Sequence, residues 1–406
     1  MPAAISAPID ALDGDRLARR NVFVLAAAQA LAGGNTTVIV TTGGIVGAML
    51  APDKGLATLP ITLMVIGMWL GTLPIGALAK TYGRRFALQA GSAMGVLSGL
   101  ICCVALLQGL FWLFLLGAFC SGVYGASHQS YRFAAADTAS ESFRPKAVSW
   151  VLAGGVLSAV IGPQLIIFTK DFWPPYLFAV TFLGQAALAL MAALVLVFVK
   201  IPRPPAADNK SGGRPLGQIV RAPRFITAAV CGAASYGMMN LVMTSTPLAM
   251  LACDHSVTDA TLGLQWHVLA MYIPSFFTGS LIGRFGIDRI VILGLTLIFG
   301  SAVVALSGIT LWHFWTVLVL LGVGWNFAFI GATTMVTQCH TPAERNKVQA
   351  FNDFLVFGSM ALGSFSSGQL LARFGWAAVN EVVFPAVLAA AALLIWRRMR
   401  ERRAAA

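Results

Sequence analysis

The sequence predicts an all-α integral membrane protein with twelve transmembrane helices in two pseudosymmetric six-helix bundles, and three observations support this fold. Of the 406 residues, 58% are apolar and only 10% are charged, whereas about a quarter of a typical soluble domain is charged. The apolar residues gather in runs long enough to cross a bilayer, which takes about 20 residues per helix. A short basic loop recurs at half-chain spacing. Together these features exclude a water-soluble fold.

Apolar runs bounded by charged residues, Gly or Pro give the expected spans in order. A hydrophilic linker that contains Pro202, Pro204, Pro205 and a Gly-Gly pair separates two halves of similar length. We expect a cytoplasmic tail at 1–20, an N-terminal bundle at 21–199, the linker at 200–223, a C-terminal bundle at 224–396 and a basic tail at 397–406. The expected spans are 21–50, 57–79, 87–107, 111–134, 147–169, 175–199, 224–251, 261–282, 290–308, 312–338, 348–372 and 378–396.

The basic residues predict the orientation of these spans. With a cytoplasmic N-terminus and alternating spans, every Lys and Arg except Lys54, Lys170 and Arg373 falls on the cytoplasmic side. A positive-inside bias of this size predicts that both termini are cytoplasmic. The net charge of +12 is scattered between apolar runs, so we expect the lipid bilayer as a partner and no nucleic acid.

The loop after the second span is repeated after the eighth span. The first copy runs from Gly76 to Arg85 and the second from Gly279 to Arg289, an offset of 203 residues. Both copies begin with glycine, have leucine at the third position and have glycine again at the eighth. A repeat at half-chain spacing is typical of transporters built from two related bundles.

This loop, the six-plus-six arrangement and the long central linker resemble the major facilitator superfamily of secondary transporters over essentially the whole chain. The resemblance implies alternating access around a site near the middle of the membrane. One departure concerns the inner gate, because Lys80 stands where members of the family usually carry an acidic residue. We therefore expect a different set of charges to hold that gate, namely Lys80, Arg84, Arg132, Asp137 and Glu141.

The expected membrane interior offers sulfur and imidazole but few charged groups. No carboxylate lies mid-membrane in the first ten spans, which weakens a proton-coupled drug exporter and a carrier of hard divalent ions. Met239 and Met243 share one face of span seven, and His267 and Met271 share one face of span eight. Counting about 1.5 Å per residue places both pairs near mid-membrane. Thioether and imidazole ligands favour Cu(I) before zinc or iron.

The four-ligand pattern resembles the CcoA-like copper importers of bacteria. The resemblance implies that copper is imported across the bacterial inner membrane as a substrate, not held as a cofactor, for assembly of cbb-type cytochrome c oxidase. It also implies cytoplasmic copper-handling proteins as partners. Four further residues are candidates for relay or entry of the ion, although packing or a solvated loop explains each of them more simply: Cys231, Met250, Cys253 and His255.

Two other functions stay open at this point. One is a non-transporting assembly partner that holds copper or haem, with His267 as the axial ligand. The other is a transporter of a small organic solute or drug, which would use polar and aromatic residues of the interior. An enzyme is not expected, because the sequence has no nucleophile-base pair and no metal-hydrolase motif. The residues expected to line a pocket for an organic solute are Tyr236, Asn240, Gln265, Trp266 and His128.

Overall fold

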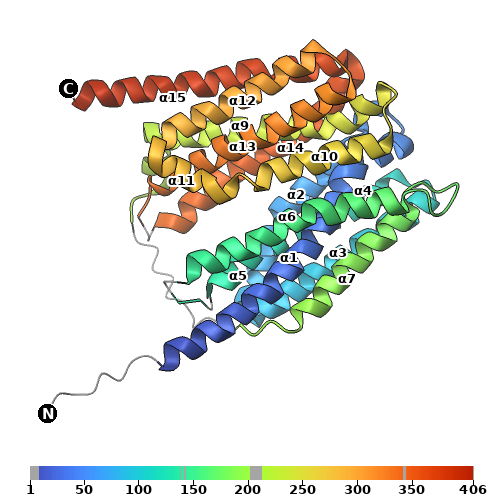
Figure 1. Ribbon diagram of the computed structural model, residues 1–406, viewed down its shortest axis with the longest axis horizontal. Coiled ribbons are helices and arrows are strands. Elements are labelled where there is room, and N and C mark those ends of the chain that lie inside the picture. Colours follow the sequence, from blue (N-terminus) through green and yellow to red (C-terminus); the bar gives the residue numbers. More distant parts are fainter. Residues whose placement is uncertain (1–8, 138, 141–142, 202–212, 342–343, 406) are drawn as a thin grey trace. The chain divides into compact units, whose positions relative to one another are not determined.

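The computed structural model describes residues 9–137, 139–140, 143–201, 213–341 and 344–405 (Figure 1). Within these ranges the chain forms helices and turns and no strand, so the prediction of an all-α protein is confirmed. The chain divides into two compact units, which we describe one at a time. The first comprises Met1–Ile39 and Gly67–Ala207, and the second comprises Val40–Ile66 and Asp208–Ala406. The bundle bounds expected from the sequence stay predictions.

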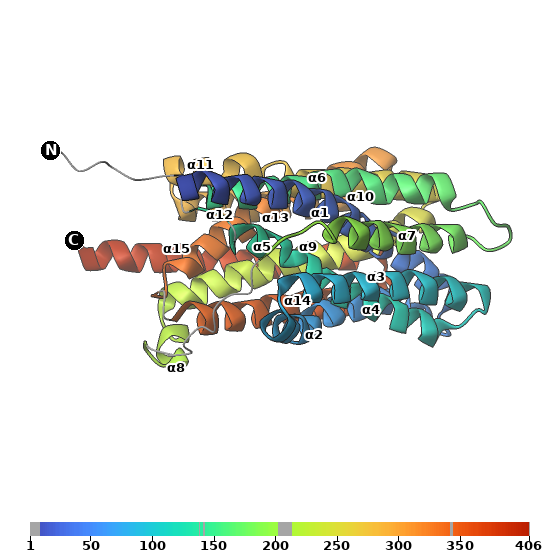
Figure 2. The same cartoon turned by 90° about the horizontal axis from the view of Figure 1, so that it is seen from below.

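The first unit is built from the helices coloured blue to green in Figure 1. Helix α3 packs against both α4 and α7, and Figure 2 also shows α3 and α7 close together. Small residues permit this contact, since a Cβ at Gly99 would lie 2.6 Å from the backbone nitrogen of Ala186. The helices are α1 (Ile9–Leu50), α2 (Leu59–Tyr82), α3 (Arg84–Leu107), α4 (Phe111–Gln129), α5 (Tyr131–Asp137), α6 (Arg144–Thr169) and α7 (Ala179–Leu196), with α1 and α2 continuing into the second unit.

The second unit contains the helices coloured yellow-green to red in Figure 1. Helix α9 packs against α13, α14 and α15, and α12 packs against α13 and α15. Gly375 has φ 78° and interrupts α14 with a kink. The helices are α8 (Leu216–Val220), α9 (Pro223–Ala252), α10 (Val257–Tyr272), α11 (Ser275–Phe285), α12 (Ile287–Ser307), α13 (Leu311–Thr337), α14 (Arg345–Glu381) and α15 (Val383–Ala405).

The helices suit a chain that crosses a membrane many times. Among the described residues, nine helices are long and apolar enough to span, or ten if α10 and α11, bent by 43°, form one span. The stretch Lys347–Glu401 counts once among the nine but contains α14 and α15, and α6 adds the shorter apolar segment Ala153–Thr169. These segments cover all twelve expected runs, so the multi-pass helical membrane fold is confirmed.

The repeated loop has the same local geometry in its two copies. Gly83 precedes α3 with φ 94° and ψ 159°, and Gly286 precedes α12 with φ 87° and ψ 152°. Side chains rarely adopt this backbone conformation, which glycine reaches without a steric cost. The glycine at the eighth position of each copy is thus required by a sharp turn between two consecutive helices.

The connection between α1 and α2 packs on α14 within the second unit. It contains a short helix, η1 (Lys54–Leu56), that contacts α14. The Thr58 hydroxyl donates to the Ser364 carbonyl (2.9 Å), and the Gln369 amide donates to the Gly55 carbonyl (2.9 Å). These hydrogen bonds explain why residues Val40–Ile66 belong to the second unit, although in the sequence they precede most residues of the first unit.

A buried carboxylate attaches the end of the central linker to the beginning of α14. Glu344 accepts hydrogen bonds from the Arg214 backbone N–H (2.7 Å), from Arg214 Nε (2.9 Å) and from the Thr341 N–H (3.0 Å). The Arg214 guanidinium, helped by the two backbone N–H groups, lowers the pKa of Glu344 well below its usual value. The ionised carboxylate therefore stabilises this attachment at neutral pH.

We expect Glu344→Gln to expose the Arg214 amide, because the ion pair and the charge-assisted hydrogen bonds are lost. Since the folded-state pKa is depressed, the stabilisation is complete above the ordinary Glu pKa of about 4.5 and is lost only as pH falls toward the lower folded value. Hydrogen exchange at Arg214, corrected for the intrinsic rate, should show protection in the wild type from pH 7 to pH 5. The exposed Glu381→Gln is the control. Unchanged protection in Glu344→Gln would contradict the assignment.

Candidate functional site

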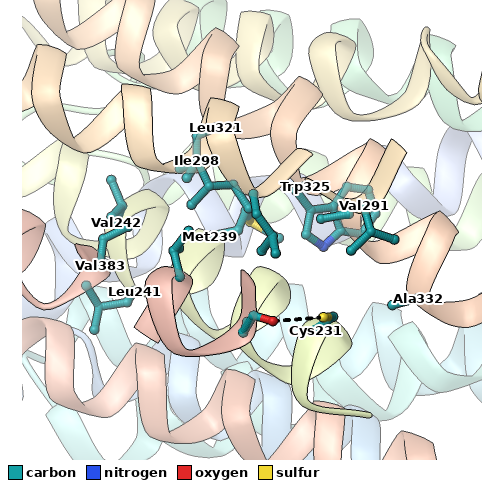
Figure 3. Close-up of a cluster of buried hydrophobic side chains, with 14 of the residues drawn as sticks. Cys231, Met239, Leu241, Val242, Val291, Ile298, Leu321, Trp325, Ala332 and Val383 are labelled. Atoms are coloured by element: carbon teal, nitrogen blue, oxygen red, sulfur yellow. Dashed lines mark hydrogen bonds between the residues drawn. The ribbon is translucent and has the colours of Figure 1, made fainter. Parts of the chain in front are cut away.

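Three of the four predicted metal ligands lie in the apolar core of the second unit. Met239, Met243 and Met271 are all buried there, and Figure 3 shows Met239 among Ile298 and Val242. The thioethers therefore pack against hydrocarbon side chains of neighbouring helices.

His267 faces α13 and is completely buried. Its Nδ1 lies 2.7 Å from the Leu318 carbonyl oxygen, which can only accept, so Nδ1 carries the proton. Nε2 is then the acceptor nitrogen, and among the described residues it has no hydrogen-bond partner. The imidazole is thus fixed in one tautomer by the backbone of α13.

The four predicted relay and entry residues all lie in or beside the second unit's helices, and their role in relay or entry stays a prediction. The Cys231 thiol donates to the Ala390 carbonyl (3.7 Å) inside the core shown in Figure 3. Met250 is fully buried in a cluster with Phe314, and His255 Nε2 lies 2.9 Å from the Ile309 carbonyl oxygen. Burial raises the pKa of Cys253, which favours the neutral thiol.

The predicted inner gate is described only in part. Lys80 is exposed near the end of α2, and Arg84 begins α3 beside the turn at Gly83. Arg132 is half-buried in α5. Glu141 and the side chain of Asp137 lie outside the described residues, so the pairing expected for Arg132 stays a prediction.

A polar cluster lies on α1 and α4 of the first unit. The His128 ring is 8% exposed, with Nε2 3.1 Å from the Thr36 hydroxyl and Nδ1 3.4 Å from the Gln29 amide nitrogen. The Tyr124 and Tyr131 rings meet the imidazole edge-on, with centroids 5.9 and 6.3 Å away. Gln29 and Thr36 are near the middle of a long apolar helix, so this unit presents neutral hydrogen-bonding groups within its membrane-spanning part.

An aromatic cluster lies on α9 and α13 of the second unit. Trp325 and Phe329 stack with an interplanar angle of 14° and centroids 5.2 Å apart. The Tyr236 ring meets both edge-on, at 5.0 Å from Trp325 and 4.8 Å from Phe329. Trp325 is buried, whereas Tyr236 and Phe329 are half-buried and keep part of their surface accessible.

The aromatic cluster is located near mid-membrane. Tyr236 is 13 residues into the 30-residue helix α9, about 20 Å along it. Trp325 is 14 residues into the 27-residue helix α13, also near the middle of its helix. The Trp325 Nε1–H has no partner among the described residues. The half-buried rings of Tyr236 and Phe329 can therefore stack on a flat ring.

The other residues expected to line a pocket for an organic solute differ in their roles. Asn240 is buried and donates to the Met360 carbonyl (2.8 Å), so it joins α9 to α14. Gln265 is half-buried, and Trp266 beside it on α10 is 47% exposed. Trp325 and Phe329 were missed by the sequence reasoning, although two aromatics four residues apart in one span are a readable signal.

The chain matches the family profile of the Major Facilitator Superfamily over residues 22–266 and again over residues 229–406. It is 47% identical to the riboflavin transporter RfnT of Brucella anthropi, over 94% of this chain and 96% of that protein. It is 27% identical to the uncharacterized MFS-type transporter YddS of Bacillus subtilis, over 96% of this chain and 93% of the relative.

Solved structures show the same fold at low sequence identity. The nucleoside transporter NupG, in a mutant form, has a TM-score of 0.73 at 13% identity and covers 92% of this chain and 99% of its own. A bacterial homologue of the human lysosomal transporter Spinster, in an inward-facing and unoccupied conformation, has a TM-score of 0.67 at 15% identity, over 93% of this chain and 95% of its own.

These relatives correct the prediction of copper import, its role in oxidase assembly included. A relative that is nearly half identical over almost the whole chain is a riboflavin transporter, so the function drawn from the likeness to CcoA-like importers is wrong. No contact in the structure tests whether the four Met and His residues bind a metal ion. The wider resemblance is confirmed, and the protein is a transporter and not an enzyme. The chain belongs to the Major Facilitator Superfamily.

Proposed function

We propose that this protein carries riboflavin, or a closely related uncharged flavin, across the membrane. The observation that carries the proposal is the 47% identity to a riboflavin transporter over 94% of this chain. This is the organic-solute alternative left open by the sequence. The positive-inside distribution of Lys and Arg supports an inner membrane with both termini on the cytoplasmic side.

The chemistry of the two clusters supports a flavin. Riboflavin has a flat three-ring system with polar edges and a chain of hydroxyl groups, and it carries no charge at neutral pH. A flat ring needs an aromatic platform, which the half-buried faces of Tyr236 and Phe329 offer. Considered by itself, the first unit presents neutral hydrogen-bonding groups at Gln29, Thr36 and His128, which suit the hydroxyl and ring nitrogen groups of such a compound.

The scarcity of intramembrane acids in the sequence is consistent with such a substrate. No carboxylate was expected mid-membrane in the first ten spans. An intramembrane charge is costly and serves to bind or move another charge. A carrier of an uncharged heteroaromatic compound does not need one to hold its substrate.

Uptake of labelled riboflavin tests the proposal directly. The chain is expressed in a bacterial host that can neither make nor import riboflavin, and growth on micromolar riboflavin is scored together with accumulation of the label. We expect both to appear with this chain and to be absent with the empty vector. A matched excess of unlabelled riboflavin should abolish accumulation, whereas the same excess of a nucleoside should not. Wild-type protein that reaches the membrane but gives neither growth nor accumulation would overturn the proposal.

A further inference from the structure

One end of the second unit contains a cavity rich in arginine. Its volume is about 710 Å³, and it lies where the repeated loop meets the ends of α13 and α15 and the beginning of α9. The cavity is on the membrane face that the distribution of Lys and Arg predicts to be cytoplasmic. The charged residues in its lining are Arg224, Arg284, Arg289, Arg397, Arg398, Asp288 and Glu401.

Both carboxylates of the cavity form ion pairs with one buried arginine. Arg397 is 3% exposed, and its guanidinium donates to Asp288 (2.5 Å) and to Glu401 (2.9 Å). The Arg397 Nε is buried and has no partner among the described residues. A guanidinium held in place by two acids forms a rigid wall, and its own charge is already balanced.

The other four arginines leave the cavity with an excess of positive charge. Arg224 donates to the neutral Gln338 side chain, and Arg284 lies over the Phe285 ring, 5.3 Å from its centroid. Arg289 and Arg398 have no carboxylate within ion-pair distance in the part of the chain that the structure describes. Five guanidinium groups face two carboxylates, and this imbalance favours an anion that several arginines can share.

The backbone at the wall of the cavity also favours an anion. Helix α12 begins there, and its N-cap, Gly286, provides no side-chain hydrogen bond to the first turn. The first N–H groups of a helix lack partners within the helix and lie at the positive end of its dipole. Asp288 lies in the same first turn and its carboxylate is held by Arg397. The N–H groups and Arg289 thus form a set of donors that suits the oxygens of a phosphate group.

The surroundings of the cavity indicate which kind of phosphate compound would bind there. Phe285, Trp396 and Met399 lie in or beside the lining and are between 43% and 49% exposed. Large apolar side chains of this kind, with Arg400 over the Trp396 ring, are typical of the boundary between headgroups and hydrocarbon. We propose that this cavity binds the phosphate headgroup of an anionic phospholipid of the cytoplasmic leaflet, with Arg289 and Arg398 as its main contacts.

Lipid binding by matched variants tests the site without using transport. The full chain is purified in detergent, and retained lipid is measured by native mass spectrometry after titration with phosphatidylglycerol or phosphatidylcholine of the same acyl chains. The double variant R289Q/R398Q removes two charges from the cavity. The control R221Q/R403Q removes two charges from exposed positions outside the lining. We leave Arg397 unchanged because its two ion pairs are structural.

We expect the wild type and the control to bind phosphatidylglycerol, and R289Q/R398Q to bind it at least about tenfold more weakly, since two charge-assisted hydrogen bonds are lost. Phosphatidylcholine and millimolar inorganic phosphate should not compete. If the double variant unfolds in phosphatidylcholine, the single variants R289Q and R398Q give the same comparison. Equal binding by the cavity variants, or displacement of the lipid by inorganic phosphate alone, would overturn the proposal.

Discussion

Replacing Phe329 with alanine is expected to reduce riboflavin uptake by about 5-fold to 100-fold at equal membrane abundance. The Phe329 ring is half-buried and stacks on Trp325. Stacking of a flat heteroaromatic ring on one aromatic side chain is worth about 1–3 kcal/mol, and each 1.4 kcal/mol is a factor of ten. The initial rate of uptake of labelled riboflavin, normalised to the amount of protein in the membrane, measures the effect.

Two further variants separate stacking from a general loss of aromatic packing. Phe329→Tyr keeps the ring and should keep at least half of the uptake. Trp312→Ala removes a larger aromatic from an exposed position near the beginning of the same helix, 71% exposed, and should leave uptake unchanged. If Phe329→Ala transports riboflavin like the wild type, the aromatic cluster is not the flavin platform, although the chain could still be a riboflavin carrier.

Composition and repeats were enough to predict the fold, because both act through simple physical requirements. A helix that crosses hydrocarbon must be apolar over about 20 residues, and this requirement is visible in the sequence. Gly83 and Gly286 were readable as a repeat because a positive φ at the turn restricts both positions to glycine.

The candidate site was harder to predict. The spacing of side chains along a helix shows which residues share a face, but not what that face contacts. Met239 and Met243 do share a face, but both are buried in the core of the second unit. Soft side chains fill such cores as readily as they bind a soft ion.

Contacts between distant parts of the chain were also invisible to the sequence reasoning. Arg397 and Asp288 are 109 residues apart, and nothing in the local sequence of either residue points to the other. The aromatic cluster joins α9 to α13, so Tyr236 alone was named and its two partners were missed. Such pairs depend on how helices pack, which periodicity does not determine.

The second large effect is expected from Gly294→Leu, which should destabilise the second unit by about 3 kcal/mol or more. A Cβ at Gly294 would lie 2.3 Å from the Ala328 backbone nitrogen and 2.6 Å from the Gly324 carbonyl oxygen. Backbone atoms cannot move aside as side chains do, so α12 and α13 would have to separate along their contact. For a unit of this size we expect the midpoint of thermal unfolding to fall by about 6–12 °C, as measured on the purified protein in detergent.

Gly300→Leu provides a matched control on the same helix. It makes the same chemical change six residues further along α12, where a Cβ meets no atom within 4 Å. Leucine has a better helix propensity than glycine by up to about 1 kcal/mol, so this variant should unfold at the wild-type temperature or slightly above it. A loss of stability that is equal in the two variants would mean that lipid exposure or helix propensity sets the effect. If the close contact between α12 and α13 sets the effect, only Gly294→Leu should lose stability.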